Sequence, residues 1–275
     1  MAEMERSPLK GKRFVITRAA LQSEALARQF SALGAIPIVL PLVKFAEPDD
    51  FTPLDAAIAQ VERFDWVIFT SGQAVRAVVA RSQRLKAPLS RAGSKSLYAA
   101  VGPVSAETVR QAGLPVDYVA NTHTGLALAE ELGERLRGRN VLLPRSDRAN
   151  PELPAALAKH GAQVTEVVAY RTLQPTDVDK RNLSQIAAGE ADAILFFSPS
   201  AVQHFAELVG VEHLRSLQAR LAITAVGPVT AGALRAAGVE RIVVATDTTT
   251  AAVVQALEEY FAATTRPSTA GVKRG

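Results

Sequence analysis

The sequence predicts an α/β protein made of two flavodoxin-like lobes with parallel sheets, and three observations lead to this fold class. Short apolar runs alternate with helical patterns along the chain, which is typical of βαβ units covered by helices on both faces. The chain contains a long internal repeat. At 275 residues and 48% hydrophobic content it is also large enough to bury two ordinary cores.

The internal repeat is the most informative of these features. Residues 98–113 (YAAVGPVSAETVRQAG) and 223–238 (ITAVGPVTAGALRAAG) are identical at nine of sixteen positions. Two further pairs of segments keep nearly the same offset: 65–71 with 192–198, and 14–18 with 141–145. Solenoid and propeller repeats span about 20 to 50 residues, so a repeat of this length indicates a duplicated domain.

The expected elements follow in order along each copy. In the first copy we predict strands over residues 13–17, 36–40, 66–70, 96–101 and 116–120, with helices over 21–33, 73–81, 105–112 and 124–136. The second copy repeats this pattern, with strands near 140–143, 163–168, 193–197, 221–226 and 241–244. Five strands in each copy favour two flavodoxin-like sheets.

Two extended segments, residues 36–45 and 163–173, are about twice the mean strand length of roughly 5–6 residues. We expect them to run antiparallel and to join the lobes as a two-stranded β-ladder. The lobes would then be interleaved, with a polar, disordered tail at the end: residues 1–43 and 172–262, residues 44–171, and the tail 263–275. Two sequential lobes divided near Gly138 remain an alternative.

The composition narrows the classes of ligand and partner. A net charge of +4 favours acidic small molecules, whereas 5% aromatic residues with no interleaved basic run argue against nucleic acid. No apolar run approaches the roughly 18 to 20 residues of a membrane helix, and the start lacks a signal-peptide pattern. We therefore expect a cytoplasmic monomer with no membrane partner.

The residue types that hold metals and nucleotide cofactors are missing or wrongly spaced. The chain has no cysteine, and its four histidines show no HxH or HExxH spacing. It contains no Walker-type loop and no GxGxxG loop. We therefore expect neither a metal nor a cofactor.

Candidate binding residues follow the strands, because ligands of open parallel sheets bind at the carboxyl ends of strands, beside helix N-termini. The positions with a hydroxyl group or a glycine there are Thr70, Ser71, Gly102, Ser105, Thr122, Ser198, Ser200, Gly227, Thr230 and Thr248. Arg18 and Arg145 each end the first strand of a copy. Any one hydroxyl could simply cap a helix, but their number predicts an interlobe cleft for several anionic groups.

Tyr170 differs in kind from these residues. It lies on the predicted return connector, where its phenol could donate a proton to a bound molecule or could simply pack against the hinge. Asp147 and Asp247 are carboxylates near strand ends, but the sequence assigns them no acid–base role.

Taken together, the motifs resemble those of the uroporphyrinogen-III synthase family over residues 12–262. The resemblance is carried by Ile16-Thr-Arg18, Phe69-Thr-Ser71, Val101-Gly-Pro103, Leu143-Pro-Arg145, Val168-Ala-Tyr-Arg-Thr172, Phe197-Ser-Pro-Ser200, Val226-Gly-Pro-Val-Thr-Ala231 and the segment that begins at Pro41. It implies two lobes joined by a β-ladder and a cofactor-free carbon–oxygen lyase (a cyclising hydro-lyase) of tetrapyrrole synthesis.

The resemblance also implies a substrate and residue roles. The substrate would be hydroxymethylbilane, a linear tetrapyrrole with eight carboxylates, which is cyclised with loss of water and inversion of its last ring. Tyr170 would be the proton donor, and the contacts to substrate carboxylates would come from Thr70, Ser71, Ser105, Ser198 and Thr230. Gln73 stands where some members offer a cation, and Val229-Thr230 stands where members can show two threonines.

Two other functions are compatible with the same residues. One is a non-catalytic, two-lobed protein that binds or senses an anionic small molecule. The other is an NAD-type oxidoreductase, which the missing glycine fingerprint disfavours.

Overall fold

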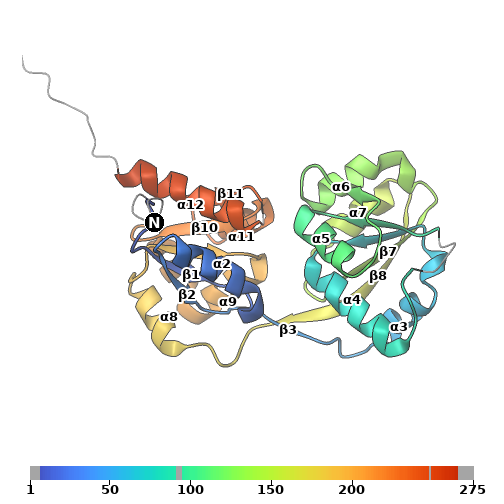
Figure 1. Cartoon of the computed structure of the whole chain (residues 1–275), viewed down its shortest axis with the longest axis horizontal. Helices are drawn as coiled ribbons and strands as arrows, with labels where there is room; N and C mark the ends of the chain where they lie inside the picture. Colours follow the sequence, from blue (N-terminus) through green and yellow to red (C-terminus); the bar gives the residue numbers. More distant parts are fainter. Residues whose placement is uncertain (1–6, 91–94, 248, 266–275) are drawn as a thin grey trace, which may run out of the picture. The chain divides into compact units, whose positions relative to one another are not determined.

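The computed structural model describes residues 7–90, 95–247 and 249–265, and they form two compact units. Unit 1 contains the chain up to Lys44 and from Gln174 onward, and unit 2 is the continuous segment Phe45–Leu173. In Figure 1 the blue first strands therefore belong to the same unit as the orange and red elements near the end of the chain.

Unit 1 is a five-stranded sheet in the order β11-β10-β9-β1-β2, and the residue registers show every pair to be parallel. Its elements are β1 (Arg13–Ile16), α2 (Ala20–Ala32), β2 (Ile36–Val39), α8 (Lys180–Ala187), β9 (Ala193–Phe196), α9 (Pro199–Val209), α10 (Val211–Leu217), β10 (Ala222–Val226), α11 (Pro228–Ala236), β11 (Ile242–Ala245) and α12 (Thr250–Thr265). The order is that of flavodoxin-like sheets.

Unit 2 repeats this order and adds one strand, giving β3-β8-β7-β4-β5-β6. Its elements are β3 (Lys44–Ala46), α3 (Thr52–Ala59), a 3₁₀ turn (Val61–Arg63), β4 (Trp66–Phe69), α4 (Gly72–Leu85), β5 (Leu97–Ala100), α5 (Pro103–Gln111), β6 (Tyr118–Val119), α6 (Gly125–Leu132), a second 3₁₀ turn (Gly133–Leu136), β7 (Asn140–Ser146), α7 (Glu152–Lys159) and β8 (Gln163–Leu173). Strands β7 and β8 take the places here that β1 and β2 take in unit 1.

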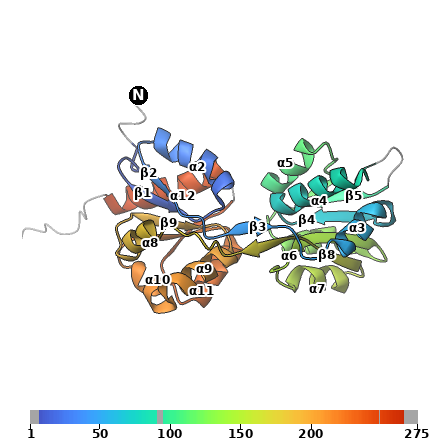
Figure 2. The same ribbon diagram turned by 90° about the horizontal axis from the view of Figure 1, so that it is seen from below.

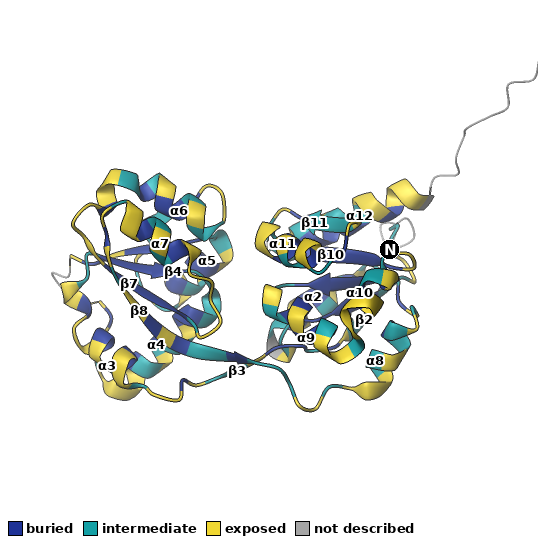
Figure 3. Cartoon of the chain, turned by 180° about the vertical axis from the view of Figure 1, so that it is seen from behind, coloured by how far each residue is buried: buried dark blue, intermediate teal, exposed yellow. Residues whose placement is uncertain are grey.

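Helices cover both faces of each sheet, as the alternating pattern predicts (Figure 2). In unit 2, Val67 and Phe69 of β4 pack beneath α3, α4 and α5, whereas Trp66 and Ile68 pack beneath α6 and α7. Successive side chains of a strand point to opposite faces, so one four-residue strand serves two cores. Figure 3 shows the resulting buried strands at the centre of each unit.

The predicted fold class, two flavodoxin-like parallel sheets, is confirmed by these orders. The predicted pairing of the two extended segments is also present, since β3 is a hydrogen-bonded neighbour of β8. The sequential alternative divided near Gly138 does not describe the sheets, because β1 pairs with β9, about 180 residues further along the chain.

Three expectations about single elements are corrected by the structure. The predicted continuous segment 36–45 is two strands, because Pro41 has no N–H to donate to a ladder and ends β2. The predicted strand 116–120 is reduced to the two residues of β6. Helix α12 continues to Thr265, three residues into the expected tail, and residues 266–275 lie outside the described part of the chain.

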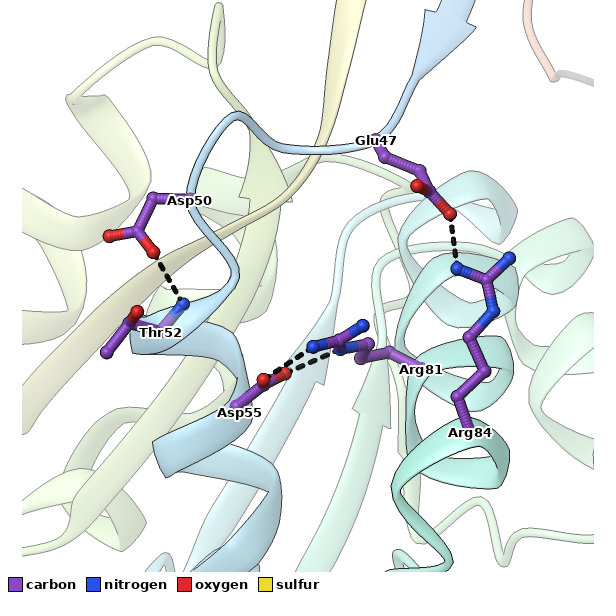
Figure 4. A network of polar contacts seen from close by, with 6 residues as sticks. All are labelled: Glu47, Asp50, Thr52, Asp55, Arg81 and Arg84. Atoms are coloured by element: carbon purple, nitrogen blue, oxygen red, sulfur yellow. Dashed lines mark hydrogen bonds and ion pairs between the residues drawn. The ribbon is translucent and has the colours of Figure 1, made fainter.

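Helix α3 is absent from the sequence prediction, and a polar network holds it in place (Figure 4). Asp50 precedes the N-cap residue Phe51, and its side chain accepts a hydrogen bond at 2.8 Å from the Thr52 amide, the first amide of the helix. Asp55 then pairs with Arg81 of α4 through two hydrogen bonds of 2.6 and 2.5 Å. The Arg81 guanidinium lowers the pKa of the Asp55 carboxyl below its usual range.

We predict that Phe14→Ala selectively destabilises the strands of unit 1. Phe14 is fully buried and its ring lies 4.8 Å from that of Phe30 and 5.7 Å from that of Phe261, measured between centroids. Removing such a ring costs about 3–5 kcal/mol. Amide hydrogen exchange should accelerate in β9, β10 and β11 while β4 keeps its protection.

Ile36→Ala is the matched control, because Ile36 lies in the same sheet but is 51% exposed. We expect it to cost about 1 kcal/mol or less. Faster amide hydrogen exchange in β4 rather than in β9–β11 after Phe14→Ala would contradict the observed sheet order, in which β1 lies beside β9.

Candidate functional site

Two serines occupy matching positions at the carboxyl edges of the two sheets. Ser71 follows β4 and its Oγ accepts a hydrogen bond from the Ala74 amide at 3.2 Å. Ser198 follows β9 and accepts from the Ala201 amide at the same distance. Both are helix N-caps, as the sequence indicates; Thr70 directly precedes Ser71, and Ser200 follows Ser198 after Pro199. The first amides of such helices have no intrahelical partner and face the edge of the sheet.

A glycine follows the next strand of each sheet, Gly102 after β5 and Gly227 after β10. Gly102 and Gly227 are the N-caps of α5 and α11, and a proline follows each. Gly227 has a φ of +85°, a left-handed conformation that favours glycine. Ser105 and Thr230 are buried, with 8% and 3% of the residue exposed, so they can offer a ligand backbone amides more readily than hydroxyls.

The segment between β6 and α6 carries Thr122 and is held by Glu131, which the sequence analysis missed. The Glu131 carboxylate accepts hydrogen bonds from the amides of Asn121 (2.9 Å) and Thr122 (3.3 Å) and from the Tyr118 hydroxyl (2.8 Å). The bond from the Asn121 amide is the main reason why the pKa of Glu131 is lowered. The matching candidate of unit 1, Thr248, lies outside the described residues.

The two arginines have different surroundings. Arg145 is buried; its Nη1 lies 2.8 Å from Glu166 Oε2 and its Nη2 donates to the carbonyl of Asn150. Arg18 is half-buried, its Nε donates to Gln22 Oε1 at 3.0 Å, and its guanidinium lies 5.2 Å from the centroid of the Phe197 ring. Arg145 therefore already has a structural role within unit 2.

Tyr170 lies on β8 with its hydroxyl 3.3 Å from Ser71 Oγ, so the predicted phenol and the predicted cap form one hydrogen-bonded pair. Its ring also packs edge-on against Phe45 of β3, with 5.4 Å between the centroids. Burial raises the pKa of the phenol, and the charge of Asp147 acts in the same direction, whereas the Ser71 bond and Arg76 oppose it. The group therefore carries its proton at neutral pH and can donate it.

The remaining features of the described residues lie apart from these strand ends. A cavity of about 420 Å³ is lined by Leu221 and Arg241 at the amino ends of β10 and β11, opposite to Gly227. Within residues 7–90, 95–247 and 249–265, no group of three or more acidic, histidine or cysteine side chains could hold a metal ion. None of the helices in the same ranges is long and apolar enough to span a bilayer.

The sheet orders and the capped strand ends define the chain as a two-unit α/β protein of the flavodoxin-like class. The family model for uroporphyrinogen-III synthase HemD matches residues 24–255. The uroporphyrinogen-III synthase of Synechococcus elongatus is 33% identical over 232 residues, a match that covers 82% of this chain and 87% of that protein. The chain belongs to the uroporphyrinogen-III synthase family.

Solved structures share the fold of this chain. A crystal structure of uroporphyrinogen-III synthase from Thermus thermophilus is 26% identical, covers 93% of this chain and all of its own, and has a TM-score of 0.53. A mutant form of the same enzyme has a TM-score of 0.66 at 24% identity and covers 92% of this chain and 99% of its own.

We predict that Glu131→Gln loosens the segment between β6 and α6. A lowered pKa means that the stabilisation is present above the unfolded-state value of about 4.3 and is lost as the pH falls through the folded-state value. The neutral amide should mimic that acidic state at pH 7. Hydrogen-exchange protection of the Asn121 and Thr122 amides should fall, whereas Glu134→Gln, an exposed glutamate of the next turn, should leave both unchanged.

Proposed function

We propose that this chain cyclises hydroxymethylbilane to uroporphyrinogen III, with loss of water and inversion of the last pyrrole ring, as a carbon–oxygen lyase without a cofactor. The observation that carries the proposal is the Tyr170–Ser71 pair at the carboxyl edge of the unit 2 sheet. Family membership supports the substrate, and the pair supplies a proton donor where a ligand of such a sheet binds.

The carboxylates of the substrate are bound by helix N-termini of both units in this proposal. The first turns of α4, α5 and α6 serve in unit 2, and those of α9, α11 and α12 serve in unit 1. Each helix N-terminus stabilises a nearby anion by about 0.3–1 kcal/mol, so recognition depends on many modest contacts. A substrate with eight carboxylates can use all of them.

Tyr170 acts on the leaving hydroxyl. Its phenol donates a proton as the carbon–oxygen bond breaks, so water leaves and a resonance-stabilised azafulvene cation remains. The phenolate is stabilised by the Ser71 hydroxyl and by the positive end of α4, and it recovers the proton when the ring aromatises. Attack by the far ring gives a spiro intermediate, which opens and closes again as the inverted macrocycle.

The main task of the protein is to control geometry rather than to supply reactive groups. The linear substrate can also close without inversion, so the ends must be held in one pose while the spiro centre forms. Such positioning can contribute roughly 7–11 kcal/mol. Contacts from two separately folded units suit this task, because each can fix one part of a long, flexible molecule.

The reaction can be tested with the purified chain and enzymatically generated hydroxymethylbilane. We predict that isomer III of uroporphyrinogen is the main product on chromatographic separation. If only isomer I forms at the spontaneous rate while the substrate remains bound, the chain is a binding protein and the proposed function is wrong.

We predict that Tyr170→Phe slows dehydration by about 10²–10⁴-fold without abolishing it, because acid assistance typically contributes that much. Single-turnover kinetics at neutral pH measure the effect. Because the phenol pKa is raised, the wild-type rate should fall only as the pH rises above about 10.

Tyr260→Phe is the matched control, since Tyr260 lies on α12 in unit 1 and is 37% exposed. It should keep the full rate. A Tyr170→Phe variant that dehydrates the substrate as fast as the wild type would remove Tyr170 from the mechanism.

The expectation of a cytoplasmic monomer with no nucleic acid or membrane partner is part of this proposal. It is supported by the composition of the chain and by the small, soluble character of the proposed substrate.

A further inference from the structure

A β-bulge lies directly beside Tyr170. Along the β7–β8 pair Arg145 is opposite Val168, but the next residue, Ser146, is opposite Tyr170, so Ala169 has no partner. A bulge bends its strand and redirects the following side chain, and bulges are frequent next to active sites. The direction of the Tyr170 side chain therefore depends on whatever holds β8 after the bulge.

Asp147 makes the bonds that hold this part of β8. Its amide donates to the carbonyl of Tyr170 at 3.2 Å, and its Oδ1 accepts from the Thr172 amide at 2.9 Å. Oδ1 also accepts from Ser146 Oγ at 3.0 Å, and that hydroxyl lies 2.9 Å from Thr172 Oγ1. One residue thus contacts the strand at Tyr170 and again two residues beyond it.

We propose that Asp147 is a positioning residue for Tyr170: its carboxylate clamps β8 after the bulge and keeps the phenol at the Ser71 hydroxyl. This inference rests on the proposed function, in which Tyr170 is the acid. The inference gives Asp147 a role, whereas the position of this carboxylate near a strand end indicated none.

The charge of Asp147 matters in addition to its hydrogen bonds. The groups that act on the phenol are Ser71, which is the N-cap of α4, Arg76 of α4, Arg145 of β7, and Asp147, which directly follows β7; the Phe45 ring of β3 packs against the Tyr170 ring. Asp147 is the anion of this set, so it disfavours the phenolate, whereas the two arginines favour it. Neutralising Asp147 should lower the phenol pKa as well as loosen the strand.

A double-mutant cycle tests the inference. Asp147→Asn should slow single-turnover dehydration by about 10- to 100-fold, since small misplacements of a reacting group cost that much. In the Tyr170→Phe background the same change should cost nothing further. The fall in rate at high pH should also begin at a lower pH in Asp147→Asn, which a purely structural role would not produce.

Asp179→Asn is the matched control. Asp179 of unit 1 likewise accepts bonds from two backbone amides, those of Arg181 and Asn182, at the start of α8. It should keep the wild-type rate and pH profile. If Asp147→Asn unfolds the protein, Ser146→Ala removes one donor to the carboxylate and should show a smaller loss that is also absent in the Tyr170→Phe background.

The outcomes separate this inference from the proposed function. The positioning role is wrong if Tyr170→Phe slows dehydration but the rate losses of Tyr170→Phe and Asp147→Asn multiply in the double mutant. It is also wrong if Asp147→Asn keeps the full rate. In both cases the proposed function stands. If Tyr170→Phe itself keeps the full rate, both the acid and its positioning residue are overturned. Formation of isomer III by the wild type tests the reaction independently of both.

Discussion

The exchange of two strand pairs between the halves of the repeat is the constraint on which the rest of this structure depends. Strands β1 and β2 complete the sheet of β9, β10 and β11, and β7 and β8 complete that of β4, β5 and β6. Without its exchanged pair, β9 or β4 would lose a hydrogen-bonded neighbour along one whole edge and would leave buried amides unpaired. Neither half of the repeat is therefore a complete folding unit, although the two halves are similar in sequence.

The repeat makes the two sheets alike, but the chemistry at their edges differs. Ser71 both caps α4 and bonds to Tyr170, so the phenol lies beside a helix N-terminus. Ser198 is the equivalent cap in unit 1, yet the stretch that follows β2, residues 40–43, reads Leu-Pro-Leu-Val and contains no hydroxyl group. The proposed acid is thus a specialisation of one copy, while anion-binding helix starts remain in both.

The sequence was sufficient for the fold class, because the repeat and the buried apolar runs such as β4 and β9 are strong local signals. It was also sufficient for Ser71 and Ser198, since a serine after a buried strand and before a helix pattern is a typical N-cap. It did not predict α3, whose start depends on Asp50 and whose position depends on the distant Arg81. Roles for Glu131 and Asp147 arise only from contacts across loops and strands, and the burial of Arg145 depends on its pairing with Glu166. No spacing along the chain encodes such contacts.

The division of the chain also has a consequence for synthesis on the ribosome. Unit 2 is one uninterrupted stretch and has all its strands once Leu173 has emerged, but β1 and β2 need partners that are translated much later. At typical rates of about 5–20 residues per second, the nascent amino-terminal strands wait roughly 10 to 40 seconds for β11. During that interval their apolar residues are exposed, and the partly made chain is the form most open to chaperones and to aggregation.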